Sequence, residues 1–97
     1  MKQLKEVFIG KGQVKGFKFT QIKKTKNAYL YRVDTGDSKH YEVFERKENT
    51  QFNCISYPSN KAFGVWAKTT KNYNNALELL EMLDSKVSLR KEIFNER

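Results

Sequence analysis

The chain has 97 residues, and its 19 lysines and arginines outweigh its 11 aspartates and glutamates to give a formal net charge of +8 at pH 7. This length favours one domain with one modest core, here residues 1–97, and excludes a pair of catalytic domains or a large cofactor-binding fold. An aromatic content of 13% argues against wholesale disorder.

The first strand is predicted from Gln13 to Lys24. Phe17 and Phe19 fall on one of its faces at a spacing of two, which is typical of a strand. Val14 and Ile22 fall on the opposite face.

The clearest hairpin joins residues 28–33 and 39–46 around the turn sequence Asp-Thr-Gly-Asp-Ser. A three-residue loop pairs Tyr31 with Tyr41, and aromatic residues pair well across strands. A two-residue loop sets Tyr31 against Glu42 instead, which is a less favourable pair. The favoured register therefore places three tyrosines on one face, namely Tyr29, Tyr31 and Tyr41.

Two more strands are predicted in the middle of the chain. A polar link over residues 46–50 leads to a short strand within residues 51–57. Residues 62–69 form the next strand, with Phe63 on the core face and Trp66 projecting from the other.

The hydrophobic period then changes to that of a helix. Thr70 or Asn72 is a suitable cap, and we expect one helix running to about residue 94, although a second short helix from near Ser85 is an alternative. The predicted buried stripe consists of Ala76, Leu77, Leu80, Leu83, Val87 and Phe94.

These elements predict an α+β fold, in which an antiparallel sheet of four to five strands, arranged as a meander, is covered by one C-terminal helix. A small barrel with the helix at one end is the alternative architecture.

The chemistry-bearing residues are few. Cys54 is the only cysteine, so it forms neither an internal disulfide nor a multi-thiolate metal site. His40 is the only histidine, and its neighbours supply no nucleophile, which leaves a small ribonuclease as the least supported hypothesis. We therefore predict no catalytic residue, no metal and no cofactor, and hence a protein that is not an enzyme.

The location of the protein is predicted from the segments it lacks. The apolar run Val7–Ile9 is too short for a signal peptide. No segment has the roughly 18 consecutive apolar residues of a membrane span, and a single cysteine suits a reducing compartment. We expect a soluble, cytoplasmic protein without a membrane partner.

The positive charge is concentrated at one end of the sequence. Residues 1–33 carry the whole net charge of +8, and residues 34–97 are neutral. A localised positive field attracts polyanions, of which nucleic acid is the commonest, whereas a solvated surface that keeps the protein soluble is the alternative. The predicted nucleic-acid-binding residues are Lys11, Lys15, Phe17, Lys18, Lys23, Lys24, Lys26 and Arg32.

The pentad Lys15-Gly16-Phe17-Lys18-Phe19 resembles the RNA-recognition-motif octapeptide, in which strand aromatics stack on bases. It departs from that motif at Lys18, where a small residue is expected, and in its position near the start of the chain. Gly12–Phe19 is similar to an early element of cold-shock domains, but the second aromatic cluster is missing and a C-terminal helix is foreign to them. We assign neither family, and the alternative is that Phe17 and Phe19 are ordinary core residues.

A second hypothesis is a protein-interaction module, either a homodimer or an inhibitor of a host factor, that does not bind nucleic acid. Tyrosine and tryptophan are enriched at interfaces. Alternatively, the tyrosines lie on the face covered by the helix, and the tryptophan packs under the loop at Pro58. The candidate contact residues are Tyr29, Tyr31, Tyr41 and Trp66.

The segment Tyr57-Pro58-Ser59-Asn60-Lys61-Ala62-Phe63-Gly64-Val65-Trp66-Ala67, with the polar cap and leucine helix after it, resembles a pattern in small uncharacterised proteins of bacterial phages and mobile elements. The resemblance covers the C-terminal half and brings no activity with it. It implies an accessory, non-enzymatic, cytoplasmic protein.

Overall fold

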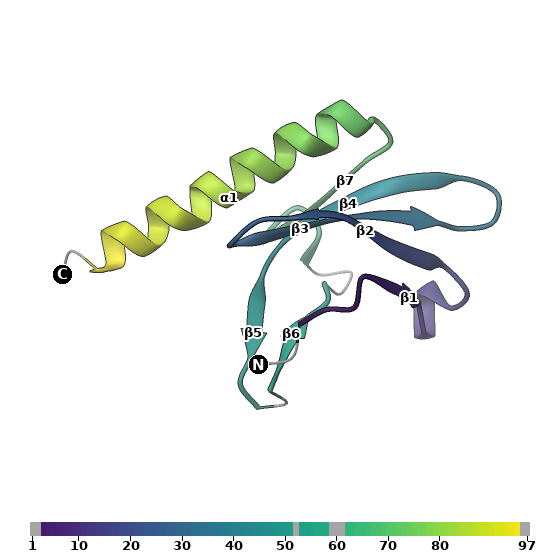
Figure 1. Ribbon diagram of the computed structural model, residues 1–97, viewed down its shortest axis with the longest axis horizontal. Helices are drawn as coiled ribbons and strands as arrows, with labels where there is room; N and C mark the ends of the chain where they lie inside the picture. Colours follow the sequence, from purple (N-terminus) through teal and green to yellow (C-terminus); the bar gives the residue numbers. More distant parts are fainter. Residues whose placement is uncertain (1–2, 52, 59–61, 96–97) are drawn as a thin grey trace.

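The fold consists of a five-stranded antiparallel sheet with one C-terminal helix, as predicted (Figure 1). The computed structural model describes residues 3–51, 53–58 and 62–95. The sheet contains, in spatial order, β1 (Val7–Ile9), β2 (Lys18–Lys24), β3 (Ala28–Asp34), β4 (Lys39–Glu45) and β7 (Ala67–Thr70). The remaining elements are the 3-10 helix η1 (Gly12–Val14), the two-stranded sheet of β5 (Lys47–Asn49) and β6 (Cys54–Ser56), and the helix α1 (Tyr73–Asn95).

Both faces of the sheet bury apolar side chains. Helix α1 packs on one face, against β3, β4 and β7, and the buried residues there are Ala28, Leu30, Val43, Ala76, Leu80 and Leu83. The opposite face lies toward β1 and the β5–β6 hairpin, and its buried cluster contains Phe19, Tyr29, Tyr31, Val33, Phe44, Ile55, Ala62 and Ala67. The order of strands leaves β1 and β7 as the two edges, so the chain forms an open sheet and not the alternative barrel.

The register of the β3–β4 hairpin differs by one residue from the predicted one. Tyr31 lies opposite Glu42, around a turn in which the Thr35 amide donates to the Ser38 carbonyl oxygen at 2.9 Å. The predicted three-residue loop is therefore wrong. Because a slip of one residue moves a side chain to the other face of a sheet, Tyr41 lies on the α1 side, away from the other two tyrosines.

Two of the predicted strands begin too early. The strand predicted from Gln13 is β2, and it starts only at Lys18. The reason is that the 3-10 helix η1 and Gly16, with its φ of 85°, precede it. The last starts at Ala67 and not at residue 62, because Gly64 has a φ of 88° within a turn. A positive φ is tolerated by glycine and interrupts an extended strand.

The middle of the chain contains one strand more than predicted. The link over residues 46–50 forms strand β5, which pairs with β6 through Glu48 opposite Ile55. Phe63 and Trp66 do not project from opposite faces. Both are partly buried against the cluster opposite α1, because the turn that contains them breaks the alternation of a strand.

The predicted long helix is confirmed as one element. Its cap is Asn72, whose Oδ1 accepts the backbone N–H of Asn75 at 2.9 Å, as expected for an asparagine at this position. The inward stripe is buried at Ala76, Leu80, Leu83 and Val87. Phe94 is the last residue of the predicted stripe, and its side chain is not among those that the structure describes.

A polar cluster ties the β2–β3 turn to the middle of α1. The Thr25 hydroxyl donates to Asp84 Oδ1 at 2.6 Å, and the Asn27 backbone N–H donates to the same oxygen at 3.1 Å. The Asn27 side chain donates to Ser88 Oγ at 2.7 Å and accepts from Lys91 Nζ at 2.9 Å. Asn27 is buried, so this cluster fixes the position of the helix across the sheet.

Candidate nucleic-acid interface

Helix α1 covers only part of the sheet face on which it packs. In Figure 1 the β3–β4 hairpin extends past the start of α1. Arg32 lies opposite both Thr20 and Tyr41, and residues paired in antiparallel strands share a face. We call this uncovered region the open face, and its residues are Val7, Ile9, Lys18, Thr20, Arg32, Asp34, Lys39 and Tyr41.

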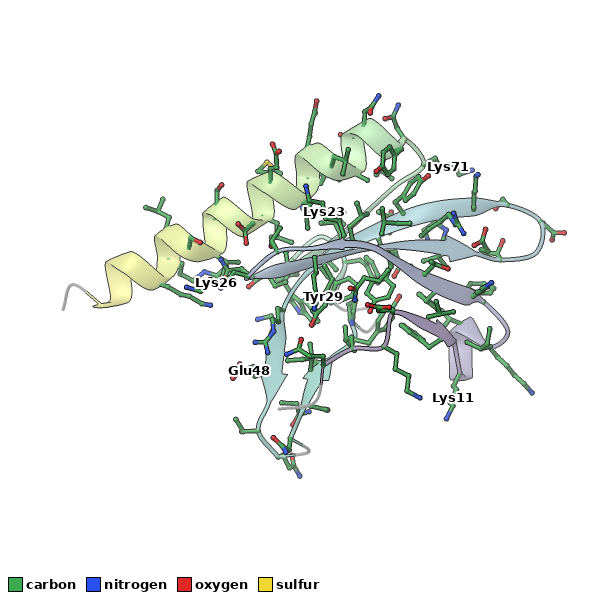
Figure 2. All side chains as sticks on the ribbon, viewed as in Figure 1. Lys11, Lys23, Lys26, Tyr29, Glu48 and Lys71 are labelled. Carbon is green, nitrogen blue, oxygen red and sulfur yellow. The ribbon has the colours of Figure 1, made fainter. Side chains whose placement is uncertain are left out.

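The open face is basic. Lys18 and Lys39 are exposed. In the strand register Asp34 lies between them, opposite Lys18 of β2 and opposite Lys39 of β4. Arg32 Nε lies 3.1 Å from Asp34 Oδ2, and both side chains keep 37% of their surface exposed. Lys71 lies beside the start of α1, at the same end of the molecule (Figure 2). Asp37, in the turn of the hairpin, borders the same hollow as Asp34 and Lys39, so four cations share this region with two carboxylates.

Two tyrosines lie where the open face meets the helix. The ring of Tyr41 is 5.6 Å from that of Tyr73, at an interplanar angle of 57°. Tyr73 is 45% exposed, and at the far side of the open face Val7 and Ile9 are 53% and 56% exposed. This combination of cations and an accessible ring suits the phosphates and bases of an unpaired strand.

The eight predicted nucleic-acid-binding residues do not form one surface. Lys18 and Arg32 belong to the open face, and Lys23, opposite Leu30, points to the same side (Figure 2). Lys24 lies opposite Tyr29 and so belongs to the other face. The others lie away from the open face: Lys26 in the β2–β3 turn, and Lys11 and Lys15 at either end of η1.

The two predicted stacking rings of the pentad are not exposed platforms. Phe19 is fully buried, and Phe17 is partly buried against the same cluster, opposite α1. The alternative, that both are core residues of the strand, holds for Phe19, whereas Phe17 precedes β2 and is only partly buried.

Tyr29 and Tyr31 are interior residues, so they do not form an exposed interaction surface. They also lie on the face away from α1 and not under it. Their hydroxyls donate to Gln3 Oε1 at 2.8 Å and to the Lys5 carbonyl oxygen at 2.6 Å, and burial raises the pKa of Tyr31 to about 12. Trp66 is partly buried, with Lys47 Nζ 5.3 Å from its ring centroid.

His40 belongs to a partly buried polar group that the sequence did not reveal. Its Nε2 lies 3.0 Å from Glu42 Oε2, and the Tyr57 hydroxyl donates to Glu42 Oε1. Burial, followed by the Glu42 carboxylate, raises the pKa of Tyr57 well above its ordinary value. Glu42 is thus a satisfied interior carboxylate that orients His40.

Within the described residues, no cluster of three histidines, cysteines or acids is placed to hold a metal ion, and no helix has the length and apolarity of a membrane span. No protein-family model, curated protein or solved structure matches the chain. No relative therefore supplies an activity for it.

Proposed function

We propose that this protein binds nucleic acid on the open face. The observation that supports this most directly is the position of α1, which leaves uncovered the part of the sheet where Lys18, Arg32 and Lys39 lie around Tyr41. A sheet surface of this kind, with cations around aromatic rings, is the platform that many single-strand binders use.

Each group has a separate role in the proposed complex. Lys18, Lys39 and Lys71 contact phosphates, and such contacts give affinity without reading the sequence. The exposed part of Tyr73 stacks on an unpaired base. Binding is therefore weakly sequence-specific, favours single strands over duplexes, and weakens steeply as salt rises.

The test is fluorescence anisotropy with labelled single-stranded and duplex oligonucleotides, of DNA and of RNA, at about 50 mM salt and above. Changing Lys18 and Lys39 to glutamate is expected to weaken binding at least roughly tenfold and to reduce the salt slope by about 2. Tyr73→Ala is expected to weaken binding of single strands and to leave duplex binding unchanged, because only an unpaired base stacks on this ring.

The matched control changes Lys24 and Lys26 to glutamate. This variant has the same net charge as the open-face variant, but its substitutions lie outside the open face. It is expected to keep most of the affinity. Equal losses in the two double variants, or a wild-type protein without salt-dependent binding to any of the four probes, would contradict the proposal.

A second candidate, self-association, has its own supporting observation. In the described sheet β1 pairs only with β2 and forms an edge, and its two outward side chains, Val7 and Ile9, are each more than half exposed. An edge strand of this kind can pair with a second copy. After nuclease treatment, sedimentation equilibrium is expected to show that the wild-type protein is a dimer. The double variant Val7→Lys, Ile9→Lys is expected to be a monomer. A wild-type protein that is a monomer at every concentration would exclude this candidate.

A further inference from the structure

A cavity of about 570 Å³ lies beside β1, bordered by the N-terminal segment, η1 and β6. Figure 2 shows one of its lining residues, Lys11, on the side of the sheet opposite α1. Sites for small molecules in proteins typically enclose roughly 300 to 1,000 Å³. The volume is thus sufficient for a small ligand. Of the open-face residues only Val7 and Ile9 line the cavity, and Lys18, Arg32 and Lys39 do not.

The interior of the cavity is largely aromatic. The rings of Phe8 and Phe19 stack with centroids 4.7 Å apart, and the ring of Tyr57 meets that of Phe19 edge-on at 5.1 Å. Val14 and Ile55 line the same space. A ligand that fills it therefore needs an apolar body.

The wall made by the N-terminal segment is held in place by buried hydroxyls. Tyr29 donates to Gln3 Oε1 at 2.8 Å and Tyr31 donates to the Lys5 carbonyl oxygen at 2.6 Å, and both acceptor residues line the cavity. Each donor is itself buried in the sheet. The site is therefore formed before a ligand arrives, which lowers the ordering cost of binding.

The charged residues that line the cavity are lysines, while Glu6 adjoins Lys5 in the chain and the Glu42 carboxylate accepts a hydrogen bond from the lining residue Tyr57. Lys5 and Lys11 line the cavity with exposed side chains, and none of its described lining residues carries a carboxylate. We propose that this cavity binds a small amphipathic carboxylate, whose apolar body lies among the aromatic rings and whose head group lies against the two lysines. This site shares Val7 and Ile9 with the open face but none of the cations or tyrosines of the proposed nucleic-acid interface, so either proposal can fail alone.

The experiment compares three probes with the same ten-carbon body and different heads: decanoate, decanol and decyltrimethylammonium. The two ionic probes are used below their micelle-forming concentrations, and decanol is used below its solubility limit. Cys54 is half-buried and lines the cavity, so its rate of alkylation by iodoacetamide reports occupancy. Decanoate is expected to slow the alkylation most and the cation least, and amide NMR shifts are expected to change at Phe8 and Ile55. No slowing and no shift with decanoate would overturn the proposal.

The role of the lysines is tested by matched variants. Lys11→Glu is expected to weaken decanoate binding by roughly three- to tenfold, as for one reversed surface charge, and to leave decanol binding unchanged. Lys15→Glu is the control, because Lys15 borders η1 but does not line the cavity. Equal effects of the two variants, or decanol binding as tightly as decanoate, would overturn the assignment of a carboxylate head group.

Discussion

Replacing Asn27 by alanine is expected to lower the free energy of unfolding by about 3 kcal/mol, because buried hydrogen bonds are lost and their partners remain. The Asn27 side chain donates to the Asp84 carbonyl oxygen and to Ser88 Oγ and accepts from Lys91. It is 2% exposed, so water does not replace these bonds. Urea denaturation of the wild type and the variant measures the difference.

Asn75→Ala serves as the control for this prediction. Asn75 also makes a side-chain hydrogen bond, donating to Thr70 Oγ1 at 2.9 Å, but it is exposed. Its replacement is expected to change stability by no more than about 0.5 kcal/mol. A loss below about 1 kcal/mol for Asn27→Ala would show that the polar cluster does not hold the helix in place.

The folded protein is expected to lose stability steeply above pH 10. Burial raises the pKa of Tyr31 from its ordinary 10.0 to about 12, and burial beside Glu42 raises the pKa of Tyr57. The folded state therefore holds these protons more tightly than the unfolded state. The stability that Tyr31 contributes is complete below pH 10 and is lost between pH 10 and 12. The contribution of Tyr57 is also complete below pH 10 and is lost progressively above it, and each slope is about 1.4 kcal/mol per pH unit.

Tyr57→Phe separates this effect from the general titration of lysines at high pH. The variant is expected to be less stable at neutral pH by roughly 1 to 3 kcal/mol, because Glu42 loses a donor. Above pH 10 the stability of the variant is expected to fall less steeply than that of the wild type. The difference between the two slopes is about 1.4 kcal/mol per pH unit, because one titrating tyrosine is absent. Thermal melts at pH 7 to 11.5 measure both slopes, and identical slopes in the two proteins would contradict the assignment.

The periodicity of the sequence was sufficient for the helix and for the central strands of the sheet, but not for the short strands β1 and β5 or for the register of the hairpin. The leucine stripe and Asn72 identified α1 as one capped helix. The pairing of Tyr31 with Tyr41 was predicted because aromatic residues pair well across neighbouring strands. The observed turn instead has Gly36 at a φ of 97°, and the resulting register buries Tyr31 beside Phe44, with ring centroids 5.7 Å apart.

The candidate site was only partly predictable, because contacts distant in sequence decide it. Nine basic residues lie close together in residues 1–33, yet the alternation of β2 and the path of η1 distribute them over both sides of the sheet. Lys39 belongs to the open face only through the pairing of β4, and Tyr73 lies beside it only through the position of α1. The approach of Tyr57 to Glu42 likewise depends on how the chain returns after β4.

The two-sided burial of the sheet gives each side its own spectroscopic reporter. Trp66, the only tryptophan, packs against the cluster opposite α1, so its fluorescence reports on that side. The only α-helix of the described chain packs on the other side, so far-ultraviolet circular dichroism at 222 nm follows mainly that side. Coincident transitions by the two signals mark one cooperative unit, and separated transitions identify which side of the sheet opens first.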